Sequence, residues 1–213
     1  MKTVLIIGMG KFGRRLCENM LNLGNEVMII DEHEEALEDL VPLATSSKIG
    51  DCTNVEVLKS LGLGNFDIVF VCISENFQSS LEVTSLVKEL GAKYVISKAD
   101  RDIHAKFLLR NGADEVVYPD RDIADKLARR CSIDNVFDYI ELTEGYAIYE
   151  IPVKKNWVGK SILDVNFRKK YNVNILGIKN KEKTKLMPGA DYVFGEEDHL
   201  MVMGHQDIIR ELV

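Results

Sequence analysis

Short apolar runs alternate with stretches of helical periodicity along the N-terminal half of the chain. The runs at 4–7, 27–30, 68–73, 94–97, 115–118 and, more weakly, 45–49 predict buried strands. Between them, apolar residues recur every three or four positions, which predicts helices over 12–23, 34–41, 55–61, 76–90 and 103–110. Strands that alternate with helices through short connections predict an α/β fold with a doubly wound parallel sheet of the Rossmann type.

The pattern changes beyond the sixth predicted strand. One more helix is predicted over 122–132, followed by strands over 136–142, 146–153, 173–179 and 199–203. Short helical turns over 161–171 and a helix from Gln206 complete a small α+β unit. A unit of this size has a small core of its own, so we expect it to pair with a second copy.

Composition narrows the classes of partner. The 213 residues are 46% hydrophobic and 29% charged, as in globular proteins, and the net charge is −7. An acidic surface repels nucleic acid and anionic lipid, so a site for an anion would have to be a small basic region within this surface. The first strand follows Met1 almost directly, and the apolar runs are shorter than the roughly 20 residues of a membrane span. A cytoplasmic protein is expected.

The cysteines are Cys17, Cys52, Cys72 and Cys131, each in or next to an apolar segment. They include no C-x-x-C pair, and zinc sites need clustered ligands. We therefore expect buried free thiols in a reducing compartment.

A glycine-rich loop is the strongest functional motif. Residues 8–13, Gly-Met-Gly-Lys-Phe-Gly, match G-x-G-x-x-G between the first strand and the first helix. Gly8 permits the tight turn, Gly10 lets backbone N–H groups approach a phosphate, and Gly13 lets the helix pack against the strand. The helix N-terminus adds a positive dipole end. The loop predicts an adenine-nucleotide site, with an empty Rossmann loop as the alternative. Its candidate residues are Gly8, Met9, Gly10, Lys11, Phe12 and Gly13.

Polar residues after the other strands extend this site. Asp31, with Glu32 beside it, ends the second strand, where a carboxylate accepts hydrogen bonds from ribose and disfavours the 2′-phosphate of NADP. The alternative for Asp31 is a helix cap. The further candidates, after the third, fourth and fifth strands, are Asp51, Cys52 and Thr53 on the adenine side; Ile73, Ser74 and Glu75 at the switch point; and Lys98 near the phosphates.

Each of these later candidates has a structural alternative. Asp51 or Thr53 could cap the following helix, Asn76 could cap the next one, and Lys98 could be a solvated side chain. Hydride transfer needs an acid or base at the nicotinamide, and no Tyr-x-x-x-Lys pair or histidine falls at the predicted switch point. We therefore predict binding without catalysis, and a small NAD-dependent oxidoreductase is the alternative.

The chain resembles the RCK-domain regulatory subunits (TrkA/KtrA type) of Trk/Ktr potassium uptake systems. The resemblance spans essentially the whole length. Its motifs are 8–13, 50–53, 112–114 (Gly-Ala-Asp) and 203–205 (Met-Gly-His). It implies a Rossmann domain over 1–120, a crossover helix over 121–135 and a C-terminal regulatory domain (RCK-C) over 136–213.

The resemblance also implies a mechanism. Family members pair, form octameric rings and dock on a membrane subunit that conducts potassium, which places them at the inner face of the membrane. Exchange of ATP for ADP, or of NAD for NADH, changes the ring and gates the pore. A purely structural ring component that holds one fixed nucleotide such as AMP is a further alternative.

Two positions depart from the family pattern. Lys11 stands where relatives often carry an arginine that reaches the terminal phosphate, and lysine lacks the bidentate fork. Asp120 stands where relatives can carry a metal-binding glutamate, so a divalent cation at the dimer interface is one option. Some relatives bind a cyclic dinucleotide in the C-terminal domain. The comparable residues, for which an ordinary dimer core is the alternative, are Ile162, Arg168, Asn174 and Ile175.

Overall fold

The computed structural model describes residues 1–213 except 74–75, 132–137, 144, 182 and 213. The chain divides into two compact units, Met1–Arg121 and Asp122–Val213. The helix α5 (Pro119–Cys131) spans the division. It begins at Pro119, because proline has no N–H to lose in the first turn of a helix. Within the described residues, no helix has both the length and the apolar character needed to cross a bilayer.

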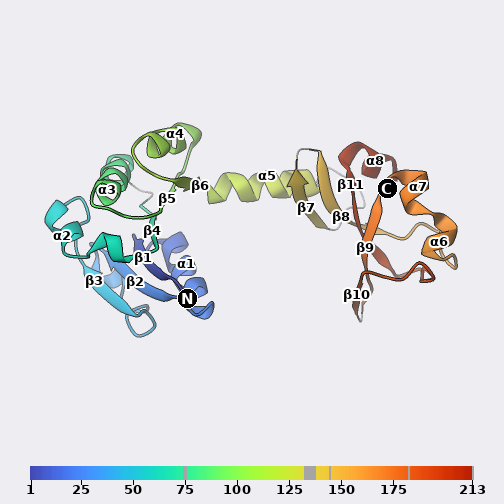
Figure 1. Ribbon diagram of the computed structural model, residues 1–213, viewed down its shortest axis with the longest axis horizontal. Helices are drawn as coiled ribbons and strands as arrows, with labels where there is room; N and C mark the ends of the chain where they lie inside the picture. Colours follow the sequence, from blue (N-terminus) through green and yellow to red (C-terminus); the bar gives the residue numbers. More distant parts are fainter. Residues whose placement is uncertain (74–75, 132–137, 144, 182, 213) are drawn as a thin grey trace. The chain divides into compact units, whose positions relative to one another are not determined.

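The N-terminal unit is a six-stranded parallel sheet flanked by helices, which confirms the predicted Rossmann fold (Figure 1). The strand order is β3-β2-β1-β4-β5-β6. The strands are β1 (Thr3–Ile7), β2 (Glu26–Asp31), β3 (Ser46–Ile49), β4 (Ile68–Val71), β5 (Val95–Lys98) and β6 (Glu115–Val117). The helices are α1 (Lys11–Asn22), α2 (Val55–Lys59), α3 (Phe77–Glu89) and α4 (Asp102–Arg110).

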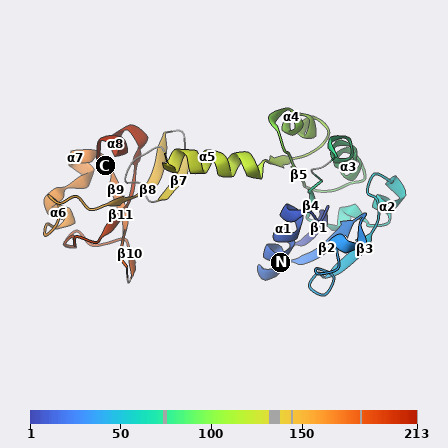
Figure 2. The ribbon, with the colours of Figure 1, turned by 180° about the vertical axis from the view of Figure 1, so that it is seen from behind.

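Alternate residues of the central strands build a core on each face of this sheet. Val4 and Ile6 of β1 pack in a cluster with Cys17 of α1. Leu5 and Ile7 pack in the opposite cluster, with residues of α2 and α3. Helices α3 and α4 lie side by side in both views (Figures 1 and 2). Because β1 and β4 are neighbours at the centre of the strand order, the connections after them diverge to opposite sides.

The prediction of a helix over 34–41 is wrong. The structure has only a 3₁₀ turn, Glu34–Ala36, followed by further turns in which Leu40 N–H donates to the Leu37 carbonyl at 2.8 Å. Like charges explain the difference: an α-helix here would place Glu34 above Glu38, and such pairs four residues apart repel. The turns still bury Leu37 and Leu40 against the sheet.

The C-terminal unit has a five-stranded antiparallel sheet in the order β10-β9-β11-β8-β7, and its described residues after α5 form three short helices. This confirms the small α+β unit. Its strands are β7 (Asp138–Thr143), β8 (Tyr146–Pro152), β9 (Asn174–Lys179), β10 (Thr184–Leu186) and β11 (His199–His205). Its helices are α6 (Ile162–Val165), α7 (Phe167–Tyr171) and α8 (Gln206–Leu212). The sequence pattern missed β10, because all three residues of this edge strand are exposed and no apolar alternation marks it.

Three of the four cysteines follow the prediction. Cys17, Cys52 and Cys72 are buried free thiols, whereas Cys131 is exposed, so the prediction for Cys131 is wrong. Cys131 is the last residue of α5, whose described residues from 120 to 128 are exposed. The position of Cys131 next to an apolar segment was therefore not enough to predict that its side chain is buried.

A buried carboxylate links three strands of the C-terminal sheet. Glu150 of β8 is 8% exposed; its Oε2 accepts from Lys179 Nζ at 2.8 Å, and its Oε1 lies 2.9 Å from His199 Nδ1. Burial raises the pKa of Glu150, but the hydrogen bonds from Lys179 and His199 outweigh this and hold it below its ordinary value of 4.5. The carboxylate therefore stabilises the fold above that pH, and the contribution is lost as the pH falls through the lowered pKa.

We expect Glu150→Gln to lower the free energy of unfolding by about 1–2 kcal/mol at pH 7. We also expect it to flatten the acid dependence of stability below pH 4.5. Urea unfolding at several pH values measures both. The control is Glu197→Gln, which breaks the exposed pair with Lys181 and should cost less than about 0.5 kcal/mol. Equal losses in the two variants would contradict the role given to Glu150.

Candidate functional site

The predicted loop and the ends of β1 and β4 meet at the carboxyl edge of the parallel sheet. Gly8 follows β1, and a Cβ built on it would lie 3.2 Å from the carbonyl group of Cys72, which follows β4. The φ of Gly8 is +93°, a conformation that L-residues rarely adopt. The turn after β1 therefore needs glycine both for its backbone conformation and for its close approach to β4.

The other two glycines have different surroundings. A Cβ on Gly13 would lie 2.1 Å from the Gly8 carbonyl oxygen, so the first turn of α1 packs directly on the loop. A Cβ on Gly10 would meet nothing within 4 Å. Gly10 is the N-cap residue of α1, has a φ of −65° and forms no side-chain cap. The sequence roles of Gly8 and Gly13 thus agree with the geometry, and the space at Gly10 is open.

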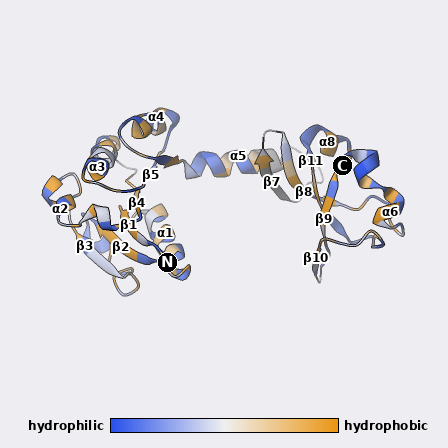
Figure 3. Cartoon of the chain, viewed as in Figure 1, coloured by the Kyte–Doolittle hydropathy of each residue, from blue (hydrophilic) through white to orange (hydrophobic). Residues whose placement is uncertain are grey.

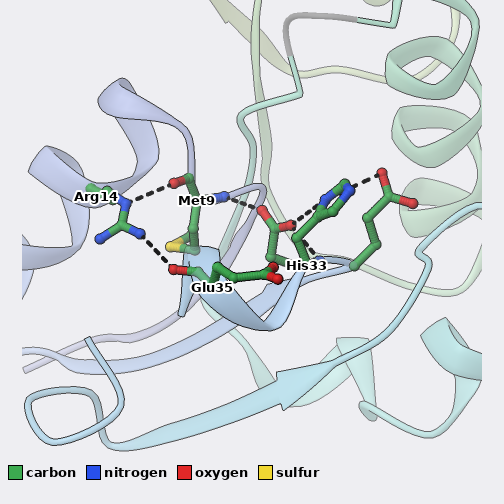
Figure 4. Close-up of polar contacts among 6 residues, drawn as sticks. Met9, Arg14, His33 and Glu35 are labelled. Carbon is green, nitrogen blue, oxygen red and sulfur yellow. Dashed lines mark hydrogen bonds and ion pairs between the residues drawn. The ribbon is translucent and has the colours of Figure 1, made fainter. Parts of the chain in front are cut away.

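Asp31 ties the end of β2 to this loop. Its Oδ2 accepts from the Met9 N–H at 2.6 Å, and its Oδ1 accepts from the His33 N–H at 2.9 Å (Figure 4). The His33 ring nitrogen Nδ1 lies 3.4 Å from the same Oδ1, and Glu32 Oε1 lies 3.9 Å from that nitrogen. Asp31 is thus not the cap of a helix. A carboxylate has about four acceptor positions, so a ribose hydroxyl could bind in addition to these donors.

Arg14 braces the loop from the first turn of α1, a contact that sequence reasoning missed. Its Nε donates to the Met9 carbonyl at 3.1 Å, and its guanidinium donates to the Glu35 carbonyl at 3.2 Å (Figure 4). A weaker ion pair joins it to Asp39 at 3.5 Å. One signal was available: a cation is unfavourable near a helix N-terminus unless a local contact or an anion compensates it.

The turn after β3 is organised by Asp51. Its Oδ1 accepts from the N–H and the hydroxyl of Thr53 at 2.8 and 2.7 Å, and these bonds lower the pKa of Asp51. The cap of α2 is Asn54, whose side chain accepts from the Glu56 N–H, so neither Asp51 nor Thr53 caps that helix.

Cys52 lies in the core beneath this turn. Its side chain packs in the cluster with residues of β1, β4 and α3. Burial raises the pKa of the Cys52 thiol to about 12, so it stays protonated at neutral pH. Only its backbone is available to a nucleotide.

The remaining predicted residues follow β4 and β5. Ile73 is half-buried against the core, while Ser74 and Glu75 lie outside the described residues. Asn76 caps α3 by accepting from the Ser79 N–H at 3.1 Å. The side chain of Lys98 is only 13% exposed and pairs with Asp100 at 2.7 Å, so it is not a solvated lysine.

The metal and cyclic-dinucleotide residues stay predictions. Asp120 is exposed in the first turn of α5. The described part of the chain contains no group of three His, Cys, Asp or Glu side chains that could hold a metal ion. In the C-terminal unit, Ile162 and Ile175 pack partly against the core, Asn174 begins β9 and Arg168 is exposed.

Comparison with known proteins connects both units to one family. The TrkA-N domain model matches residues 4–119, and the TrkA-C domain model matches residues 146–213. Ktr system potassium uptake protein C of Bacillus subtilis is 40% identical over 203 residues, which cover 95% of this chain and 92% of the relative. Ktr system potassium uptake protein A of the same organism is 36% identical, over 98% of this chain and 94% of the relative.

Solved structures share the fold at low identity. The crystal structure of the GsuK RCK domain has a TM-score of 0.65 at 18% identity and matches 99% of this chain and 46% of that one. The GsuK channel bound to NAD has a TM-score of 0.67, also at 18% identity, over 97% of this chain and 38% of that chain. This chain thus spans less than half of either structure. Together, the two domain models and the near full-length identity show that the chain belongs to the Trk/Ktr family of potassium uptake proteins.

Proposed function

We propose that this protein is a nucleotide-sensing regulatory subunit that gates a membrane potassium-conducting partner of the Trk/Ktr type. The observation that carries the proposal is the open space at Gly10, at the N-terminus of a 12-residue helix. The first N–H groups of a helix have no partner within it, and together with the helix dipole they make a helix N-terminus with free space beside it suitable for a phosphate.

The charges of α1 support a phosphate at this end. The first turn carries Lys11 and Arg14 and no acidic residue. The Met9 and Glu35 carbonyl oxygens and Asp39 already compensate Arg14. The cation whose unfavourable interaction with the helix dipole a bound anion would reverse is therefore Lys11. Because Asp31 is available to the ribose and disfavours a 2′-phosphate, the ligand would be an adenine nucleotide such as ATP, ADP, AMP, NAD or NADH. NAD and ADP are bound in the GsuK structures.

Regulation requires that the ligands differ in affinity for two states of the assembly. We propose a homo-oligomer of paired subunits, octameric as a ring, in the cytoplasm at the inner face of the membrane. A divalent cation at Asp120 and a cyclic dinucleotide at the C-terminal unit would be further inputs. No enzymatic turnover is proposed, since the relatives are named as potassium uptake proteins.

Light scattering coupled to size exclusion tests the assembly and its ligand together. The wild-type chain is measured alone and with AMP, ADP, ATP, NAD and NADH, and its thermal unfolding is followed in parallel. We expect an oligomer whose unfolding temperature rises with at least one nucleotide. A monomer that none of the five nucleotides stabilises would refute the proposal.

Lys11 is expected to determine how strongly a terminal phosphate is bound. It is exposed at the first position of α1. Lys11→Gln should weaken ATP binding by roughly fivefold and AMP binding little, as measured by calorimetry. The control is Arg15→Gln on the same helix, where the arginine pairs with Glu18. Equal weakening of ATP and AMP by Lys11→Gln would contradict this role.

A further inference from the structure

The C-terminal unit contains a basic cavity that the function proposed above does not use. It has a volume of about 330 Å³ and is formed by α6, α7 and the segment before them. The side chains that matter here are those of Trp157, Lys160, Asp164, Asn166, Lys169 and Lys170. Helix α7 is drawn blue, the hydrophilic end of the scale (Figure 3).

The charge around this cavity is opposite to that of the chain. Residues 154–170 include six basic residues and one acidic residue, whereas the whole chain has a net charge of −7. Lys160, Lys169 and Lys170 are exposed. Among the described residues, no ion pair within 4 Å joins a carboxylate to Lys160 or Lys169, although Lys160 helps the hydrogen bonds from Ser161 to lower the pKa of Asp164. Three cations around one cavity repel each other unless an anion joins them.

The one acidic residue of the cavity is already engaged. Asp164 Oδ2 accepts from the Ser161 hydroxyl at 2.6 Å and from the Ser161 N–H at 3.0 Å, which completes the capping box of α6. One carboxylate held in this way cannot balance three lysines. Asn166, between α6 and α7, has a φ of 54°, and its amide group adds a neutral hydrogen-bond donor.

We propose that this cavity binds a phosphate-bearing anion through Lys160, Lys169, Lys170 and the amide of Asn166. Its volume falls within the range of small-ligand sites, about 300–1,000 Å³. Lysine suits a phosphate because its compact charge sits on a flexible stem. The phosphate would belong either to a soluble compound or to an anionic phospholipid headgroup.

The cavity does not contain the four residues that were compared above with cyclic-dinucleotide sites. Neither Arg168 nor Asn174 lines the cavity, and neither do Ile162 and Ile175. The cavity is built from residues of the C-terminal unit, whereas the glycine loop belongs to the N-terminal unit, so the two sites share no residue. A failure of one proposal therefore leaves the other open to its own test.

The single tryptophan provides a direct readout. Trp157 is the only tryptophan of the chain, and it lines the cavity. The full chain is titrated, at constant ionic strength set with sodium chloride, with inorganic phosphate. It is titrated separately with phosphatidylcholine vesicles and with vesicles that contain about one third phosphatidylglycerol. We expect a saturable change in Trp157 emission with phosphate or with the anionic vesicles. The first result assigns a soluble ligand, the second a lipid headgroup.

A matched pair of triple variants separates the cavity from general charge. K160Q/K169Q/K170Q should weaken binding by roughly tenfold or more. K181Q/K183Q/K185Q also removes three positive charges, but from the hairpin of β9 and β10, outside the cavity. It should change the affinity for the anion by less than about twofold. Circular dichroism checks that both variants fold. Equal losses in the two variants, or no saturable change with either ligand source, would overturn the proposal.

Discussion

Replacing Gly10 by alanine is expected to weaken nucleotide binding by about 100-fold and to leave the fold intact. The added methyl group would enter the open space at the N-terminus of α1, where it would meet no protein atom within 4 Å. It would keep a phosphate away from the N–H groups of the first turn, each of which contributes about 1.5–3 kcal/mol to a charged acceptor. Calorimetry with the nucleotide that stabilises the wild type measures the loss.

The stability of this variant provides its control. Gly10 has a φ of −65°, which alanine adopts without strain. Alanine is a poorer N-cap than glycine, but it restricts the unfolded chain, and the two effects offset each other to within about 0.5 kcal/mol. Normal nucleotide affinity in the folded variant would show that the loop is not the phosphate site.

Replacing Gly13 by alanine should instead damage the fold, by about 3 kcal/mol in the free energy of unfolding. The new Cβ would lie 2.1 Å from the Gly8 carbonyl oxygen, so the helix and the loop would have to move apart. For a unit of this size, we expect the unfolding temperature to fall by roughly 10 °C. Calorimetry without any nucleotide measures this effect separately from binding.

Gly64→Ala is the matched control for Gly13→Ala. The nearest atom to its Cβ outside the neighbouring residues would be the Gly91 carbonyl oxygen at 3.8 Å, an ordinary contact. This variant should unfold within about 0.5 kcal/mol of the wild type. If Gly13→Ala were equally neutral, the packing of α1 on the glycine loop would have to be different from the one described.

The sheet could be predicted, and a candidate site could be assigned to one edge of it, because both rest on local spacing. The alternation of strand and helix periods predicted the Rossmann fold. The carboxyl ends of its parallel strands lie at one edge of the sheet, where the candidate residues were placed. Gly8 and Gly13 could be assigned roles because G-x-G-x-x-G specifies a turn and a close packing contact. The space at Gly10 followed from the same motif.

Contacts between segments distant in sequence could not be predicted in the same way. The Glu35 carbonyl accepts from Arg14, and it belongs to a segment that forms turns in place of the predicted α-helix. On α3, the buried Ser80 lies 3.2 Å from the His104 ring. A polar residue in a helix looks like a solvent-exposed position until the facing residue is known.

The hydrogen bond between Met9 and Asp31 has a kinetic consequence. Together with the hydrogen bond from Arg14 to the Met9 carbonyl, it holds the loop from two sides through contacts within the protein itself. A loop that is already ordered loses little conformational entropy on binding. Nucleotides should therefore associate at similar rates and differ mainly in residence time. How long each nucleotide stays, and not how quickly it arrives, would then set how long the subunit signals one state.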